Sequence, residues 1–321
     1  MNNNPFSRYM LKREIYKRSL LSFQSVEELS KPINIFSPTQ EIHTPNDWYG
    51  HAANLKNYLG LNSNYSFKFI MEHGLYLNDQ VDALDVEANL PTVITYSSYR
   101  KEILKKYRQN VFAIGPFIHY AKSFLSEKKI KSMREKEGKV LLFFPAHSTS
   151  VVGVEYDVKS LCNQIRKIGK GFDKIRVCMY WKDVLLNKHL YYLEQGFECV
   201  TAGHMLDPNF LPRLKSLIAL SDLTASNIIS SQAGFCIYLK KPHILLKNKF
   251  DIKSDKHWKK RIEDIFVSPE YREVAEEFSK LNFNISSQQR KLVKKYWGTD
   301  NVKTKSELKR IVKFTEECYK K

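Results

Sequence analysis

Residues 139–150 read KVLLFFPAHSTS, a short apolar run followed at once by a histidine and three hydroxyl side chains. A run this short, bounded by Gly138 and Pro145, is typical of a strand buried on both faces, as in a parallel sheet. Ligands of such sheets bind beyond the carboxyl ends of the strands. The run therefore predicts an α/β fold with a binding site near His147.

The same alternation of apolar runs and helical stretches extends in both directions along the chain. We expect strands at 32–36, 67–71, 91–95, 110–114, 174–180, 197–202, 222–226 and 243–246. We expect helices at 51–59, 99–107, 117–134, 158–167, 188–195, 210–220 and 230–240, and in the tail at 263–281, 288–296 and 305–319. Strands alternating with helices predict βαβ units. The predicted fold class is α/β, with two Rossmann-like domains facing a central cleft and a helical C-terminal tail.

The chain is long enough for two such domains. It has 321 residues, 43% of them hydrophobic, and two domains are the usual result at that length. A charged run at 126–138 precedes the apolar strand, so we predict an acceptor domain at 1–130 and a nucleotide-donor domain at 131–321. We also expect a tail helix to pack back on the first domain.

Composition narrows the class of protein. Five cysteines without CxxC spacing predict reduced thiols in the cytoplasm, and no apolar stretch approaches the roughly 20 residues of a membrane span. The net charge of +18 requires a polyanionic partner.

A basic helical stretch near the N-terminus predicts an amphipathic helix for peripheral contact with an anionic inner membrane. Its basic residues are Arg8, Lys12, Arg13, Lys17 and Arg18. A nucleic-acid-binding protein is an alternative, although no known nucleic-acid motif is visible and no such partner is expected.

Three loops after predicted strands are candidates for binding a phosphate, because hydroxyls, imidazoles and helix N-termini suit anions. Their candidate residues are His147, Ser148, Thr149, Gly203, His204, Ser226, Asn227, Ser230 and Ser231. The alternative for the histidines is a structural hydrogen bond, and for the serines ordinary helix capping.

Candidate bases lie in the first half. His73 precedes Gly74 after the strand at 67–71, and an imidazole near neutral pKa is suited to removing a proton from a hydroxyl. Glu72 would orient His73 or replace it, and Asp47 is a second candidate base. Trp48 and His51 complete a predicted acceptor-side cluster, for which the alternative is a proline-anchored turn.

The segment 211–246, LPRLKSLIALSDLTASNIISSQAGFCIYLKKPHILL, resembles the GT-B glycosyltransferases of bacterial surface polysaccharide (capsule and O-antigen) biosynthesis. The CDP-glycerol glycerophosphotransferases and the bacterial sialyl and Kdo transferases are the groups it is most similar to. His73 with Gly74 matches the base motif of the glycerophosphotransferases, and Ser230 with Ser231 matches their serine pair. The chain lacks the family's proline and arginine after His147 and the aspartate before the serines.

The resemblance implies an inverting, metal-independent glycosyltransferase without cofactor. His73 or Asp47 would act as base, and a nucleotide-activated sugar, with CMP-sugars favoured, would be transferred to an oligosaccharide or lipid-linked glycan. A CDP-alcohol polyol-phosphate transferase is the alternative enzyme, and a scaffold with an inactive cleft is the alternative outside enzymes.

Overall fold

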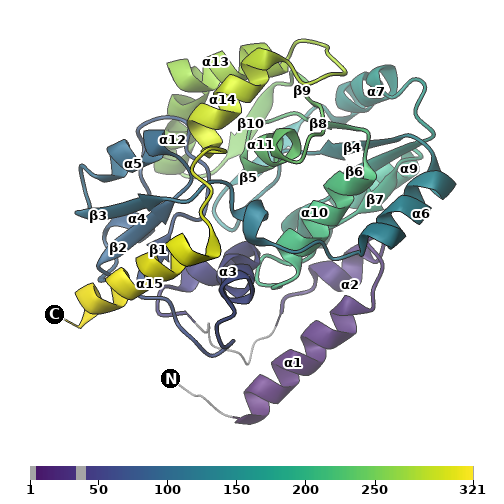
Figure 1. The fold of residues 1–321 in the computed structure, drawn as a ribbon. Coiled ribbons are helices and arrows are strands. Elements are labelled where there is room, and N and C mark those ends of the chain that lie inside the picture. Colours follow the sequence, from purple (N-terminus) through teal and green to yellow (C-terminus); the bar gives the residue numbers. More distant parts are fainter. Residues whose placement is uncertain (1–4, 34–40, 321) are drawn as a thin grey trace.

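The computed structural model describes residues 5–33 and 41–320, and its core is a five-stranded parallel sheet (Figure 1). The central strand is β4 (Val140–Phe144), the apolar run singled out above, and it pairs with β6 (Lys174–Cys178) and β8 (Leu223–Ser226). The edge strands are β7 (Glu198–Val200) and β9 (His243–Leu245). The parallel topology confirms the α/β class.

Strand β4 is buried on both faces and separates two cores. Leu141 and Phe143 pack with the cluster under α7 (Val158–Ile168), whereas Leu142 and Phe144 belong to the largest hydrophobic cluster of the described chain. Successive side chains of a strand point to opposite faces, so the four consecutive apolar residues 141–144 contribute to both cores. The larger cluster also contains Phe67 and Tyr96 from the first half, and one core therefore joins the two halves.

The first half contains a smaller parallel sheet. Its strands β1 (Phe69–Met71), β2 (Thr92–Thr95) and β3 (Asn110–Ala113) pair in sequence order, close to three of the predicted strands. The fourth prediction, at 32–36, falls largely on residues 34–40, which lie outside the described residues. Helices α3 (His51–Leu59), α4 (Ala83–Val86) and α5 (Ser98–Leu104) accompany this sheet.

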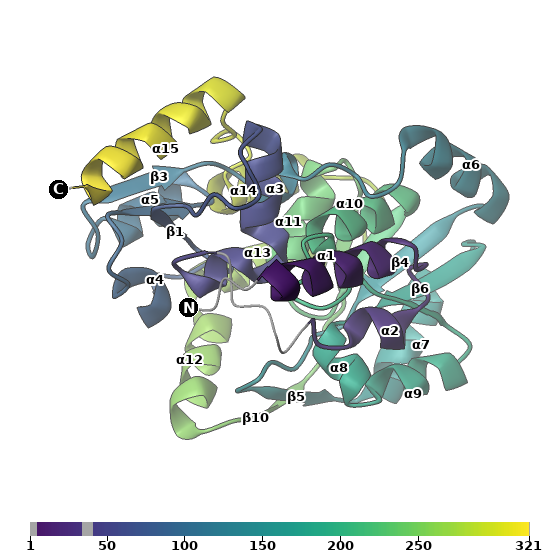
Figure 2. The same cartoon turned by 90° about the horizontal axis from the view of Figure 1, so that it is seen from below.

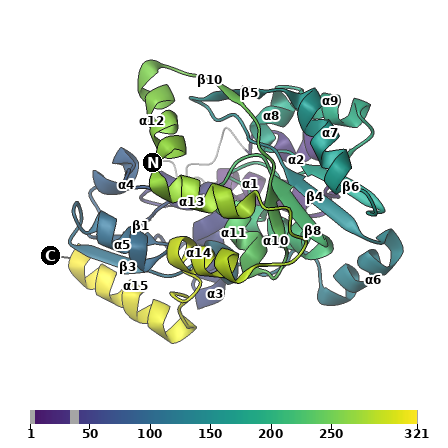
Figure 3. The same ribbon diagram turned by 90° about the horizontal axis from the view of Figure 1, so that it is seen from above.

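The C-terminal helices run back across both halves, as predicted. They are α12 (Lys256–Val267), α13 (Pro269–Phe278), α14 (Ser287–Trp297) and α15 (Lys305–Tyr319). Helix α14 packs against α5 and against α11 (Ser231–Tyr238), and Figure 3 shows it lying between the two sheets. Helix α15 packs on α3, where the Tyr65 hydroxyl donates to Glu316 Oε1 at 2.6 Å.

Helices α9 (Lys188–Glu194) and α10 (Phe210–Leu220) also match the prediction, but the single helix expected at 117–134 is wrong. The chain forms a short 3-10 turn (Phe117–Tyr120) and then α6 (Glu127–Glu137), which begins where Ser126 caps the amide of Lys129. The segment between them is extended because Phe124 and Leu125 donate their amides to α10.

Other short elements escaped the sequence patterns. They are α2 (Val26–Ser30), the 3-10 helix η1 (Thr44–Gly50), α8 (Trp181–Leu185) and the antiparallel pair β5 (Gly153–Tyr156) with β10 (Phe250–Lys253). The predicted tail helix at 263–281 is interrupted at Ser268, which caps α13 while Pro269 occupies its first turn. Helix α6 links the last strand of the small sheet to β4, and the domain boundary there stays a prediction.

Helix α1 (Pro5–Ser19) crosses the lower surface beside α2, as Figure 2 shows. It is held at its end by Arg18, whose side chain donates to the carbonyls of Leu29 and Lys31 at 2.9 Å. Tyr9 and Tyr16 are exposed among Lys12, Arg13 and Lys17, so apolar and basic side chains share the outward side instead of forming separate faces. Over residues 5–33 and 41–320, no helix has the length and apolar character needed to cross a membrane.

Trp297 fixes α14 onto α11 and offers a test of this packing. Its ring is fully buried against Gly234, where a Cβ would overlap the indole, and its Nε1 donates to the Ser231 carbonyl at 2.9 Å. Trp297→Ala should lower the free energy of unfolding by about 3–5 kcal/mol in urea titrations, since it leaves a large cavity. The control Leu281→Ala, at a side chain 61% exposed, should change it by less than about 0.5 kcal/mol. Equal effects of the two variants would contradict this packing.

Candidate functional site

A cavity of about 330 Å³ lies where the carboxyl ends of the two parallel sheets face one another. The first half contributes side chains from η1, from the loop after β1 and from the end of β2, and the second half from β4, β6, α10 and the first turn of α11. The lining residues are Tyr49, His51, His73, Gly74, Leu75, Tyr76, Tyr96, Phe144, Pro145, His147, Cys178, Met179, Tyr180, Ala202, Phe210, Leu211, Leu214, Ser230, Ser231, Gln232 and Phe235. The cavity thus occupies the ligand position that parallel sheets favour.

Five of the predicted site residues meet in this lining. His51 and His73 come from the first half, and His147, Ser230 and Ser231 come from the second. The tertiary structure therefore brings a candidate base and a candidate anion site to one cavity.

His73 lies directly after β1, where the chain turns at Gly74. Its ring is fixed edge-on by Trp48, with ring centroids 4.8 Å apart, and its Nδ1 lies 3.4 Å from Asp85 Oδ1. Burial lowers the pKa of His73, but the hydrogen bond and charge of Asp85, with Asp82 and Glu72 nearby, outweigh that effect and raise it. His73 is therefore suited to hold a proton taken from a substrate.

Asp85 was not among the predicted residues. It is fully buried at α4, with His73 on one side and His43 Nε2 3.9 Å from the same carboxylate oxygen. In sequence it is one of several acidic residues between 79 and 87, and nothing in that pattern distinguishes it. Only the fold shows which of these carboxylates meets an imidazole.

The other two predicted bases lie outside the cavity lining. Glu72 is fully buried in an ion pair with Arg100, whose Nε donates at 2.9 Å, and it also accepts a 2.5 Å hydrogen bond from the Thr95 hydroxyl. Burial raises the pKa of Glu72, opposed by Arg100. Asp47 accepts a hydrogen bond from the Glu41 amide at 3.3 Å. Of the three candidates, the geometry places His73 alone at the cavity.

Of the three predicted residues in the loop after β4, one lines the cavity and the other two hold the shape of the loop. The His147 ring packs 4.1 Å from the Tyr180 ring, and burial lowers its pKa, so the imidazole is neutral. The Ser148 hydroxyl accepts from Lys188 Nζ at 2.8 Å, and Thr149 Oγ1 accepts the amides of residues 151 and 152. Ser148 and Thr149 thus hold the shape of the loop, and neither of them lines the cavity.

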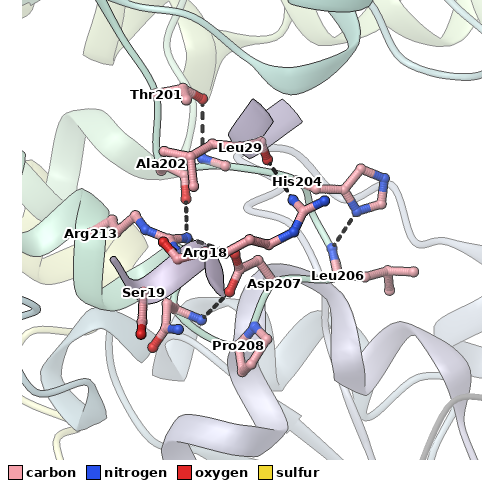
Figure 4. Close-up of polar contacts among 12 residues, drawn as sticks. Arg18, Ser19, Leu29, Thr201, Ala202, His204, Leu206, Asp207, Pro208 and Arg213 are labelled. Atoms are coloured by element: carbon pink, nitrogen blue, oxygen red, sulfur yellow. Dashed lines mark hydrogen bonds and ion pairs between the residues drawn. The ribbon is translucent and has the colours of Figure 1, made fainter. Parts of the chain in front are cut away.

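Gly203 and His204 also make contacts within the protein, in the group of polar contacts around Arg213 that Figure 4 shows. His204 accepts the Leu206 amide on Nδ1 at 3.2 Å, and its own amide donates to the Leu29 carbonyl at 2.9 Å. Burial lowers the pKa of His204 to about 4. Gly203 has a φ of +99° and lies close to Arg213, which pairs with Asp207 at 2.7 Å. These residues anchor α1 and α2 to the large sheet, and Gly203 and His204 do not line the cavity.

Two more predicted residues, Ser226 and Asn227, form hydrogen bonds within the protein. The Ser226 hydroxyl donates to the Ile228 carbonyl at 2.7 Å and lies 3.0 Å from His243 Nε2. Asn227 accepts the Ala146 amide at 2.6 Å and so ties the loop after β8 to the loop after β4. Both hold the floor of the site without lining it.

Ser230 and Ser231 begin helix α11 at the cavity wall. The Ser230 hydroxyl bonds to the side chain of Gln232 and makes no cap hydrogen bond within the helix. The first amides of a helix lack intrahelical partners, and its dipole places partial positive charge there. This end of the cavity is therefore suited to an anion.

Two tyrosines connect the halves across the cavity and were also missed. The hydroxyls of Tyr49 and Tyr180 lie 3.4 Å apart, and Tyr49 has a left-handed φ of +58°, uncommon outside glycine. Its amide donates to the Met205 carbonyl at 2.5 Å, which holds this conformation. In the parts of the chain that the structure describes, no group of three or more His, Cys, Asp and Glu is arranged to hold a metal ion.

No protein-family model matches the chain, and no curated protein matches it in sequence. Among solved structures it is similar to the wall teichoic acid polymerase TagF, with a TM-score of 0.39 and 14% identity. The match covers 72% of this chain and 58% of that one, so the chain spans less than two thirds of TagF's length in that structure. A likeness this distant says nothing about activity.

The buried neutral histidines predict loss of stability in mild acid. Burial lowers the pKa of His51 and of His243 to about 3, whereas both protonate near pH 6.5 in the unfolded chain. The unfolded state therefore binds more protons below pH 6.5, and stability is full above that pH and falls as the pH drops toward 3. Each histidine should add about 1.4 kcal/mol per pH unit to the slope.

Urea titrations at pH 7.5, 6.5 and 5.5 measure this slope. His243→Gln should flatten it by about one such increment, while His257→Gln, at an exposed position, should leave it unchanged. Identical slopes for the two variants would mean that His243 is not neutral in the folded protein.

Proposed function

We propose that the chain is an inverting glycosyltransferase that needs no metal. It would transfer a sugar from a nucleotide-activated donor, with CMP-sugars favoured, to a hydroxyl of an oligosaccharide or lipid-linked glycan in surface polysaccharide biosynthesis. One observation carries the proposal: His73, from the first half, and His147 with the first turn of α11, from the second half, line the same cavity. A base and an anion site in one cavity are what transfer from a phosphate ester to a hydroxyl requires.

In this reaction His73 accepts the proton of the acceptor hydroxyl. The acceptor oxygen forms a bond to the anomeric carbon, and the bond from that carbon to the phosphate oxygen breaks. Positioned general-base catalysis contributes about 100-fold to 10,000-fold to such steps. Trp48 limits rotation of the His73 ring, so its position relative to the acceptor is set before the substrate binds.

The departing phosphate would lie at the N-terminus of α11. The amides and hydroxyls of Ser230 and Ser231 supply hydrogen bonds, and His147 as a neutral imidazole donates one more. Hydrogen bonds to charged oxygens are stronger than neutral ones, and they strengthen as charge develops on the leaving group.

The same groups would serve a CDP-alcohol polyol-phosphate transferase, in which the acceptor oxygen attacks phosphorus instead of carbon. We place the reaction in the cytoplasm, with Tyr9, Tyr16 and the basic residues of α1 as the surface for contact with an anionic membrane. Product analysis separates the two transferases, since only one of them leaves a phosphodiester in the product.

Donor binding is tested by removing the anion contacts. His147→Ala and the double change Ser230→Ala with Ser231→Ala should each weaken nucleotide affinity by about 1–3 kcal/mol. Calorimetry against CMP, CDP, UDP and GDP measures this after a thermal-shift screen finds the ligand. Ser150→Ala, exposed in the same loop, is the matched control and should bind as the wild type does. Unchanged nucleotide affinity in both test variants would contradict the assignment of these residues to an anion site.

Catalysis is tested at His73. His73→Ala should leave donor affinity nearly intact and lower turnover by about 100-fold to 10,000-fold, because the acceptor loses its base. The melting temperature must be compared with that of the wild type, since a histidine after a strand also holds a turn. Normal turnover of His73→Ala would indicate that Asp47 is the base. Asp47→Asn should then abolish the transferase reaction while donor binding is retained.

A further inference from the structure

The buried imidazole of His43 and the partly buried imidazole of His73 lie next to one carboxylate behind the cavity wall. Asp85 Oδ1 lies 3.4 Å from His73 Nδ1 and 3.9 Å from His43 Nε2, and the Asp85 side chain is 1% exposed. The imidazoles come from different segments, His43 from the residue before η1 and His73 from the loop after β1. The carboxylate comes from α4, so three separate parts of the first half converge here.

Two atoms of this cluster lack hydrogen-bond partners among the described residues. They are His43 Nε2 and Asp85 Oδ2, both buried from solvent. A buried polar atom without a partner is costly, and an ionised oxygen without one is more costly still. A protonated ring nitrogen of His43 is a donor and the Asp85 carboxylate oxygen is an acceptor, so the two neighbouring groups are chemically complementary.

We propose that Asp85 is a positioning residue that holds His73 with Nδ1 protonated and Nε2 facing the cavity, and that His43 shares the same carboxylate. The proposal rests on the proposed function only in calling His73 the base. Asp85 stays ionised throughout, while the proton from the acceptor enters and leaves at His73 Nε2. His43 competes with His73 for Asp85 and so limits how strongly the carboxylate holds the His73 proton.

Other charged groups around the cluster are already paired or face it from further elements. Glu72 is paired with Arg100, and Asp82 accepts the Leu84 amide and the Tyr76 hydroxyl. Arg261 of α12 packs 5.6 Å from the centre of the Tyr76 ring, and His51 of α3 adds a repulsive interaction with protonated His73. Asp85 is thus the carboxylate in direct contact with His73, and Asp82 is a nearby charge without that contact.

Titration of the full chain by NMR tests the proposal without knowledge of the substrates. The chain is labelled with ¹³C and ¹⁵N at its nine histidines, and His73→Gln and His43→Gln assign the two resonances. In the wild type, the ¹⁵N shifts of neutral His73 should show the proton on Nδ1. Asp85→Asn should lower the His73 pKa by about 1–3 units and change that tautomer, because a neutral amide replaces the charge.

His43→Phe should move the His73 pKa upward, since Asp85 then serves one imidazole. Asp82→Asn is the matched control: it removes a charge of the same kind nearby, and it should shift the pKa less and keep the Nδ1 tautomer. An unchanged His73 pKa and tautomer in Asp85→Asn would overturn the proposal. Should Asp85→Asn fail to fold, a wild-type His73 protonated on Nε2 would overturn it equally.

Turnover separates this proposal from the proposed function. If Asp85 positions a working base, Asp85→Asn lowers kcat by at least about 10-fold with KM unchanged, and the loss follows the shifted pH profile. Normal turnover of His73→Ala together with the NMR result would refute the base and leave the positioning intact. Loss of turnover in His73→Ala, with no NMR change in Asp85→Asn, would refute the positioning role of Asp85 and support His73 as the base.

Discussion

The structure depends on the burial of β4 from both sides. Because neighbouring side chains of a strand point to opposite faces, Leu141 and Phe143 belong to the core beneath α7, while Leu142 and Phe144 belong to the larger core that reaches the small sheet. The second core orients the two halves, since Leu142 and Phe144 share one cluster with residues of β1 and β2. The carboxyl ends of both sheets consequently point at the same space, and the cavity forms there.

Charged groups near this space are mostly neutralised by partners in the protein. Glu72 pairs with Arg100, Asp207 with Arg213 and Lys56 with Glu41, each as a buried ion pair. Breaking such a pair leaves an uncompensated buried charge, which is strongly destabilising, so both members are committed to the fold. Several residues with the right chemical type for catalysis are therefore structural, and the imidazoles supply much of the polar chemistry of the cavity wall.

Those imidazoles differ because their surroundings differ. Burial without a facing carboxylate lowers the pKa of His51 to about 3, while Asp85 raises the pKa of His73 above its usual range. Pairs of titratable groups whose environments push their pKa values apart suggest different chemical roles. In the proposed reaction, His147 is the neutral hydrogen-bond donor beside the nucleotide and His73 is the proton acceptor beside the acceptor hydroxyl.

The sequence by itself determined most of the longer strands and helices and the general place of the cavity. Apolar runs of strand length, followed by polar residues, identified β4 and the loops of His73, His147 and Ser230, because burial and periodicity are local properties. Only the tertiary structure decided which polar residues face the cavity. His147 and Ser148 are adjacent in sequence, yet one lines the cavity and the other bonds to Lys188, from α9. Asp85 and Tyr49 were missed for the same reason, since their roles depend on partners brought close by long-range packing that no local pattern encodes.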